Sequence, residues 1–277
     1  MSQQSSPLII QAGKQNSRYF ADLWRFRELF FFLTWKDILV RYKQTVVGVL
    51  WSVLRPLLTM LTFTLVFGKF GKMPTEGTAP YALMVFAALL PWQLFSNAIG
   101  ESSNSLIANA DIISKIYFPR IILPISSIMT AVVDFAIAFA LYLFLMLWYH
   151  VVPGWQILLI PFFTLLALLT AVGGGLIVAA LNVSYRDFRY IVPFIVQFGL
   201  YVSPVGFSSR VVPDAWRLVY SLNPMVGVID GFRWCLLGED VAFYWPGFAL
   251  SVGVTTVLLV AGYKLFRSME VGFADKI

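Results

Sequence analysis

The chain has 277 residues, of which 59% are hydrophobic and 12% are charged, and its formal net charge at pH 7 is +6. Soluble globular chains carry about 45–50% apolar and about 25% charged residues, so the composition excludes an ordinary soluble protein. One cysteine and one histidine exclude a disulfide framework and argue against a Cys/His metal site. We therefore expect an all-α integral membrane protein whose positive charge reflects its topology, with membrane lipids rather than nucleic acid as partners.

A polar tail over residues 1–19 precedes an amphipathic segment over residues 20–45. On a helical wheel one side of this segment is mainly aromatic and the other mainly charged. The apolar side carries Phe20, Trp24, Phe31, Trp35, Ile38 and Tyr42. A helix of this kind lies in the plane of the membrane interface. Packing of the same helix on a soluble partner is the alternative.

Six apolar segments follow, and a helix needs about 20 such residues to cross the hydrocarbon core. They are Val46–Phe67, Tyr81–Gly100, Ile121–Trp148, Ile157–Leu181, Tyr190–Phe207 and Trp245–Leu265. The fifth is the shortest and contains Pro193 and Pro204, so its ends are the least defined. These segments predict a six-span transmembrane domain over residues 46–277.

The distribution of lysine and arginine orients the predicted bundle. If the N-terminus is cytoplasmic, fourteen of these residues fall on the inner side and five on the outer side. Such a bias marks the cytoplasmic side. Both termini are therefore predicted to be cytoplasmic.

Two polar features interrupt the predicted spans. Arg55 and Pro56 lie within the first span, where they predict a kink with a charge in the inner half of the helix. Asp134 lies in the third span, as either a hydrogen-bonded structural group or a polar gate. We expect Arg55 to face a pore or Asp134 rather than lipid.

Small residues recur at a spacing of four in the fourth span, at Ala171, Gly175 and Ala179. This spacing lets helices approach closely. Packing within one subunit is favoured over a role in a dimer.

The loop over residues 101–119 contains an apolar stripe flanked by capping oxygens on Asn109 and Asp111. The stripe consists of Leu106, Ile107, Ile112, Ile113, Ile116 and Tyr117. It predicts a short helix that either docks a soluble partner or packs against the ends of neighbouring spans.

The segment over residues 208–244 predicts two short helices on either side of Asn223 and Pro224. A seventh span there would have to bury Arg217, Asp230 and Arg233, which is costly. Short helices of this length are typical of re-entrant or interfacial pieces.

Signatures of catalysis are missing from the sequence. The string GKFGKM, from Gly68 to Met73, lacks the spacing and the Ser/Thr of a phosphate-binding loop. No G-x-S-x-G elbow, H-E-x-x-H motif or carboxylate pair suited to catalysis occurs. We therefore expect no catalytic residue and no enzyme, and any uphill transport must draw energy from a partner or an ion gradient.

Several long strings, in this order, resemble one family. They are RYKQTVVGVLWSVLRPLLTMLTFTLVFG, YALMVFAALLPWQLFSNAIGESSNSLIANADIISKIYFPRIILPISSI, ALNVSYRDFRYIVPFIVQFGLYVSPVGF and YSLNPMVGVIDGFRW. Together they resemble the transmembrane (permease) subunit of type-2 ABC exporters for surface polysaccharides such as O-antigen, capsule or teichoic acid. The resemblance covers nearly the whole chain.

This resemblance implies a homodimer in the bacterial inner membrane that pairs with two copies of a nucleotide-binding ATPase subunit. ATP and Mg²⁺ would bind to that partner, and this chain would hold no cofactor and no metal. The substrate would be a lipid-linked glycan. The segment over residues 208–244 would form a re-entrant helix pair at the outer end of the pore.

The resemblance also implies two sets of site residues. The ATPase-coupling set is Asn104, Ser105, Leu106, Ile107, Asp111, Ile112, Lys115 and Tyr117. The cations expected at the entrance for a lipid pyrophosphate are Arg25, Arg27, Arg41 and Lys43, for which ordinary anionic-lipid binding is the alternative.

A third set, for the channel, is expected from the chemistry of a sugar chain. Aromatic rings can stack on sugars, although aromatics also occur at lipid interfaces. The expected channel residues are Trp51, Phe63, Trp92, Phe95, Tyr201 and Trp216, together with Arg55.

Two other functions stay open at this point. The same fold could export drugs or small lipids. A membrane-embedded glycosyl or acyl transferase is the competitor from a different class, and the missing acid/base and metal constellations count against it.

Overall fold

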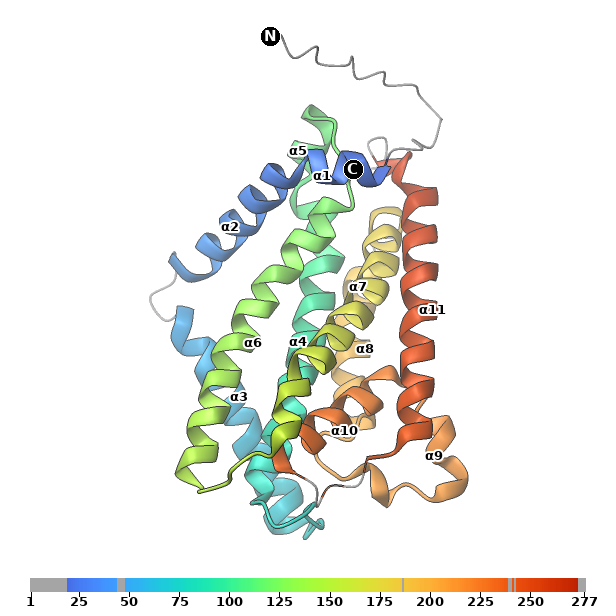
Figure 1. Ribbon diagram of the computed structural model, residues 1–277. Helices are drawn as coiled ribbons and strands as arrows, with labels where there is room; N and C mark the ends of the chain where they lie inside the picture. The colour runs from blue at the N-terminus through green and yellow to red at the C-terminus, as the bar shows by residue number, and fades with distance from the viewer. Residues whose placement is uncertain (1–18, 44–47, 186, 239–240, 242, 274–277) are drawn as a thin grey trace.

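The structure is a computed structural model that describes residues 19–43, 48–185, 187–238, 241 and 243–273. Within these ranges every regular element is a helix, as predicted (Figure 1). The first half contains α1 (Tyr19–Arg25), α2 (Arg27–Lys43), α3 (Gly48–Phe63), the π-helix η1 (Thr64–Phe70), α4 (Tyr81–Ala108), α5 (Ala110–Lys115) and α6 (Ile122–Trp148). The second half contains the 3₁₀ helices η2 (Trp155–Leu159) and η3 (Ser209–Val211), with α7 (Ile160–Ser184), α8 (Phe188–Val202), α9 (Asp214–Tyr220), α10 (Pro224–Leu237) and α11 (Trp245–Glu270).

Five helical stretches of the described chain are long and apolar enough to cross a membrane, against the six predicted. They are Leu50–Phe70, Tyr81–Ala108, Ile122–Trp148, Trp155–Ser184 and Trp245–Glu270. The start predicted at Val46 lies outside the described residues.

The predicted fifth span is shorter in the structure than its apolar run. Helix α8 has 15 residues, or about 22 Å at 1.5 Å per residue, which is less than the ~30 Å core. It ends at Val202, because the next residue precedes Pro204 and takes an extended conformation, with ψ of 153° at Ser203. The prediction that this helix runs to Phe207 was wrong.

Helix α4 is the centre of the bundle and packs against α3, α6, α7, α8 and α10 (Figure 1). Every residue from 83 to 90 is buried, so the helix has no lipid-facing side along this stretch. The larger apolar core forms around it. A second, smaller core joins α1, α2, α5 and the start of α6 to the ends of α7 and α11.

Glycines bring α7 into close contact with two neighbours. A Cβ atom at Gly175 would lie 2.6 Å from the Ser102 hydroxyl on α4. A Cβ atom at Gly262 of α11 would lie 2.3 Å from the Gly173 carbonyl oxygen on α7. Ala171 and Ala179 are fully buried. The predicted close packing of the small residues within the subunit is therefore confirmed.

Helices α1, α2 and α5 gather at one end of the bundle together with the C-terminal end of α11, and α9 and α10 lie at the opposite end (Figure 1). Leu33 fixes α2 in the smaller core. Trp24, Phe31 and Trp35 are each more than 60% exposed, so most of the predicted aromatic side faces outward. Phe20 is not among the side chains that the structure describes.

The two short helices predicted around Asn223 are present as α9 and α10. The Asn223 side chain caps α10 by accepting from the Met225 amide at 3.1 Å, and Pro224 occupies the first turn, where its missing N–H costs nothing. The cost of burying Asp230 and Arg233 counted against a seventh span, yet both residues are buried in the short helix α10.

Burial of Arg233 is compensated by four carbonyl and carboxylate groups. Its guanidinium donates to the carbonyls of Phe207 and Val205 at 3.0 Å each and of Met84 at 3.4 Å. It also pairs with buried Glu76 at 3.7 Å. A buried charge is tolerated when it is paired and hydrogen-bonded in this way.

Candidate substrate and coupling sites

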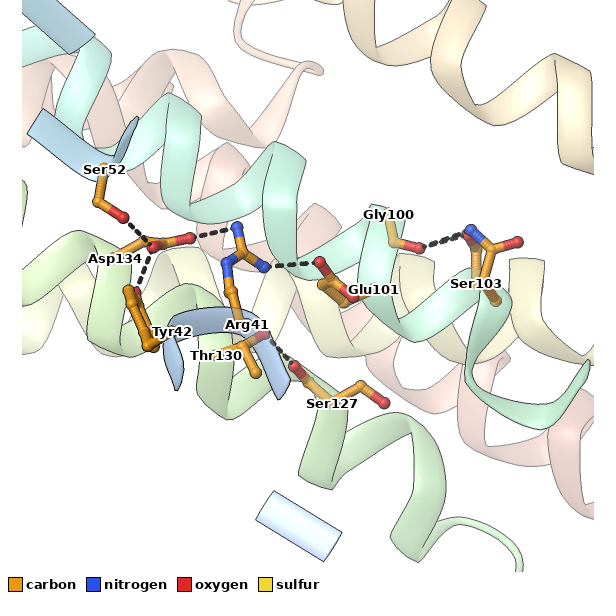
Figure 2. Close-up of polar contacts among 10 residues, drawn as sticks. Arg41, Tyr42, Ser52, Gly100, Glu101, Ser103, Ser127, Thr130 and Asp134 are labelled. Atoms are coloured by element: carbon orange, nitrogen blue, oxygen red, sulfur yellow. Dashed lines mark hydrogen bonds and ion pairs between the residues drawn. The ribbon is translucent and has the colours of Figure 1, made fainter. Parts of the chain in front are cut away.

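A polar cluster centred on Asp134 joins α6 to three other helices. Asp134 pairs with Arg41 of α2, with 2.5 Å between Oδ2 and Nη2. Its other oxygen accepts hydrogen bonds from the hydroxyls of Tyr42 at 2.5 Å and Ser52 at 2.8 Å. Arg41 also donates to Glu101 of α4 at 2.7 Å (Figure 2). The cluster therefore ties the end of α2 to α3, α4 and α6.

The structure supports the prediction that Asp134 is a hydrogen-bonded structural group. Its cationic partner differs from the one that was expected. Its cation is Arg41, and the pairing suggested for Arg55 is not found. Arg41 is separated in sequence from Asp134 by two predicted spans, so no local pattern indicated the contact. Burial, followed by the hydrogen bond to Asp134, raises the pKa of Tyr42 to about 12, which keeps this phenol a proton donor at neutral pH.

A cavity of about 460 Å³ lies between α3, α4 and α6, and Arg41 of α2 also lines it. Its walls mix apolar side chains with amides, hydroxyls and charges. The lining residues are Arg41, Trp51, Ser52, Arg55, Pro56, Leu58, Thr59, Leu90, Gln93, Leu94, Asn97, Ala131, Asp134, Phe135 and Ala138. Arg55 thus lies beside the same cavity as Asp134 without being paired to it.

The predicted channel residues separate into four places. Trp51 lines the cavity together with Arg55. Phe63 is buried and stacks on the exposed Tyr201, with ring centroids 6.3 Å apart. Trp92 is buried and Phe95 partly buried, with their rings 5.6 Å apart, in the larger core. Trp216 is exposed on α9, at the far end of the bundle.

The four predicted entrance cations are not equivalent. Arg25 and Lys43 are exposed, and Arg27 lies 5.6 Å from the Trp24 ring. Arg41 already contacts two carboxylates. Its charge is neutralised locally, which makes it a poor candidate for binding an additional anion.

The predicted coupling segment forms the end of α4 and the whole of α5. Asn109 breaks the helix between them and accepts a hydrogen bond from Lys36 of α2 at 2.9 Å. Of the predicted set, Asn104, Ile107, Asp111, Lys115 and Tyr117 are exposed, Ser105 and Leu106 are buried, and Ile112 is half-buried.

The structure divides the apolar stripe into a buried half and an exposed half. Leu106 and Ile113 pack in the smaller core. Ile107, Ile116 and Tyr117 are 44%, 55% and 57% exposed. The exposed half is available for docking, while the buried half joins this segment to the bundle.

A junction around Glu270 was missed in the sequence. Glu270 accepts hydrogen bonds from the Arg120 amide at 2.8 Å and the Tyr19 hydroxyl at 3.3 Å, and it pairs with Arg267. Arg267 also lies 3.6 Å from the Tyr19 ring centroid. Burial raises the pKa of Tyr19. Only the spacing of Arg267 and Glu270 on one helix face signalled any part of this junction.

A model of the protein family described as ABC-2 type transporter matches residues 28–237, which run from α2 to the end of α10. The chain belongs to the ABC-2 type transporter family. The matched range contains the polar cluster, the residues that line the cavity and the segment over residues 101–119.

Curated relatives of this ABC-2 protein carry names from polysaccharide export. It is 29% identical to the O-antigen export system permease protein RfbA of Myxococcus xanthus, across 94% of this chain and 99% of the relative. An RfbA of the same description from Klebsiella pneumoniae is 27% identical across 90% and 94%. The capsule polysaccharide export inner-membrane protein CtrC of Neisseria meningitidis is 28% identical across 82% and 86%.

Proposed function

We propose that this chain is the permease subunit of an ATP-driven ABC exporter that moves a lipid-linked polysaccharide, such as an O-antigen, across the bacterial inner membrane. The observation that carries the proposal is the family match, together with relatives named for O-antigen and capsule export that align along almost the whole chain. The active unit is a homodimer with two copies of a separate nucleotide-binding subunit, which supplies the ATP and Mg²⁺ site.

The proposed arrangement uses α8 as the sixth crossing and α9–α10 as a re-entrant pair at the outer end. Helix α8 carries exposed aromatic residues such as Phe194, Phe198 and Tyr201. Large exposed apolar patches on a protein mark lipid or partner contact. A channel between two subunits would be bordered by such faces, with both termini on the cytoplasmic side as the charge distribution predicts.

Coupling to ATP hydrolysis proceeds through the exposed half of the stripe. The ATPase contacts Ile107, Ile116 and Tyr117, whose movement passes into α4 through the continuous helix and into α6 through the following segment. Lys36 and Asn109 join the same segment to α2. A displacement of α5 therefore moves α2, α4 and α6 together. Such a joint movement would open a channel between the two subunits.

Deletion of the gene in its native bacterium tests this proposal. We expect surface polysaccharide to disappear while lipid-linked glycan accumulates inside the cell, and a plasmid copy to restore export. The measurement is surface immunolabelling combined with analysis of extracted lipid-linked glycan. Unchanged surface polysaccharide in the deletion strain would overturn the proposal and favour the alternative in which the same fold exports drugs or small lipids.

A further inference from the structure

Polar side chains from two helices line the cavity between α3, α4 and α6. Gln93 and Asn97 are one turn apart on α4 and half-buried, and Arg55 of α3 is exposed. Among the described residues none of these three side chains has a protein hydrogen-bond or ion-pair partner. The cavity thus offers a guanidinium and two amides, all of which can donate hydrogen bonds.

The positive charge in this cavity comes from Arg55 rather than Arg41. Asp134 and Glu101 contact Arg41 at 2.5 and 2.7 Å, so two carboxylates already neutralise this arginine. Within the described part of the chain no carboxylate lies within ion-pair distance of Arg55. An uncompensated arginine is costly at membrane depth, so an anionic ligand at this site would remove a large part of that cost.

The depth of Arg55 along α3 places its side chain within reach of a lipid head group. It is five residues beyond Leu50, where the apolar stretch begins, or about 8 Å along the helix. An arginine side chain at this depth can extend toward the interface, where lipid phosphates lie. Apolar walls from Leu58, Leu90 and Phe135 continue beside it and suit an alkyl chain.

We propose that this cavity binds a membrane lipid by its phosphate, with Arg55 pairing with the phosphate and Gln93 and Asn97 donating to its oxygens. Arginine binds phosphate through parallel charge-assisted hydrogen bonds. The lipid source is either the phosphate-bearing carrier of the glycan substrate, which rests on the proposed function, or a phospholipid. Arg41 is already paired with Asp134 and Glu101 and is not a ligand.

Photo-crosslinking in native cells that express the full chain with its ATPase tests the site. A benzophenone amino acid replaces Leu58, which lines the cavity and is 53% exposed. The matched control probe replaces Leu61, which is 50% exposed on the same helix and is not among the lining residues. Lipids joined to the purified protein are identified by mass spectrometry.

Three charge variants are combined with the Leu58 probe. We expect Arg55→Gln to lower the yield of phosphate-bearing lipid about tenfold, because one charge-assisted contact is lost. Arg55→Lys keeps the charge and retains most of the yield. Lys69→Gln removes one exposed positive charge elsewhere and leaves the yield unchanged. Comparable amounts of protein in detergent extracts show that the variants fold.

The identity of the captured lipid separates the two sources. Arg55-dependent capture of a polyprenyl-phosphate glycan supports the site and locates the substrate there. Arg55-dependent capture of phospholipid alone supports the lipid-phosphate site and overturns its assignment to the substrate, while the deletion phenotype tests export independently. Equal capture with Arg55→Gln, or the same lipids at Leu61, overturns the proposal.

Discussion

Asp134 shows how a carboxylate is accommodated inside a membrane domain. It is 9% exposed, and its two oxygens contact one guanidinium and two hydroxyls. A buried carboxylate is stable only when its partners replace the lost water. The cluster therefore depends on the charge of Asp134 and on Arg41 approaching from α2.

Asp134→Asn removes that charge and keeps nearly the same shape. The amide oxygen can still accept from Tyr42 and Ser52, but Arg41 loses the more buried of its two carboxylates and keeps only the pair with Glu101. We expect a loss of about 2 kcal/mol in the free energy of unfolding. Thermal unfolding in detergent should show a midpoint lower by roughly 5 °C.

Asp214→Asn is the matched control for this substitution. Asp214 is 99% exposed, and its pair with Arg217, at 3.7 Å, is solvated. Surface pairs of this kind contribute little to stability. Equal midpoints for the Asp134 and Asp214 variants would show that the polar cluster does not stabilise the fold.

At the scale of single residues, the sequence identified the polar positions but not their partners. Asp134 and Arg55 stand out because charges are rare in apolar runs. The partner of Asp134 depends on how α2 folds back over α6, which no local pattern specifies. The burial of Arg233 was not predicted for a similar reason, since its acceptors come from α4 and from residues 205 and 207, which are distant in the sequence.

At the scale of elements, contact between α7 and α11 depends on Gly173 and Gly262. These glycines lie outside the series of small residues at a spacing of four that was identified in the sequence. Ala171, Gly175 and Ala179 mark the face toward α4. Gly173 and Gly262 mark the contact with α11, where two backbones touch. Gly173 belongs to a run of three glycines on α7, and Gly262 is one of three glycines on α11. Neither set repeats at a helical spacing, so no sequence pattern indicated this contact.

Gly262→Ala should separate these two helices. Its Cβ atom would lie 2.3 Å from the Gly173 carbonyl oxygen, and the backbone cannot move aside cheaply. Overpacking of this kind costs about 1–3 kcal/mol. We expect a lower unfolding midpoint in detergent for this variant.

Gly253→Ala on the same helix is the control, because a Cβ atom there meets nothing within 4 Å. It should leave the midpoint unchanged or raise it, since alanine favours helix. If the two alanine variants unfold at the same temperature, the close contact between α7 and α11 does not contribute to the stability of the fold.

Element boundaries were predictable where one physical signal dominated. The long apolar runs gave α4, α6, α7 and α11, and Asn223 with Pro224 gave the start of α10. Helix α8 was overestimated because apolar residues continue through Pro204 into a turn that is buried without being helical. Hydropathy reports burial in an apolar environment, and it does not distinguish a lipid-facing helix from a buried turn.

At the scale of the whole molecule, the two ends of the bundle differ in construction. One end carries α1, α2, α5 and the Glu270 junction, and the other carries α9 and α10 with the buried Arg233 (Figure 1). The all-helical membrane fold and the family could be predicted from composition and long sequence strings. The cavity could not, because residues of α2, α3, α4 and α6 line it and no sequence pattern specifies how these helices pack.

The central claim is that this chain moves a glycan by using a partner's ATP hydrolysis. The most direct test is transport by purified permease and ATPase in liposomes with lipid-linked glycan in the outer leaflet. ATP should drive glycan into the lumen, where it resists an added glycosidase. A variant combining Ile116→Asp and Tyr117→Asp should abolish this protection, because exposed apolar contacts to the ATPase are lost. Protection that does not depend on ATP, or none despite an active ATPase, would contradict the account.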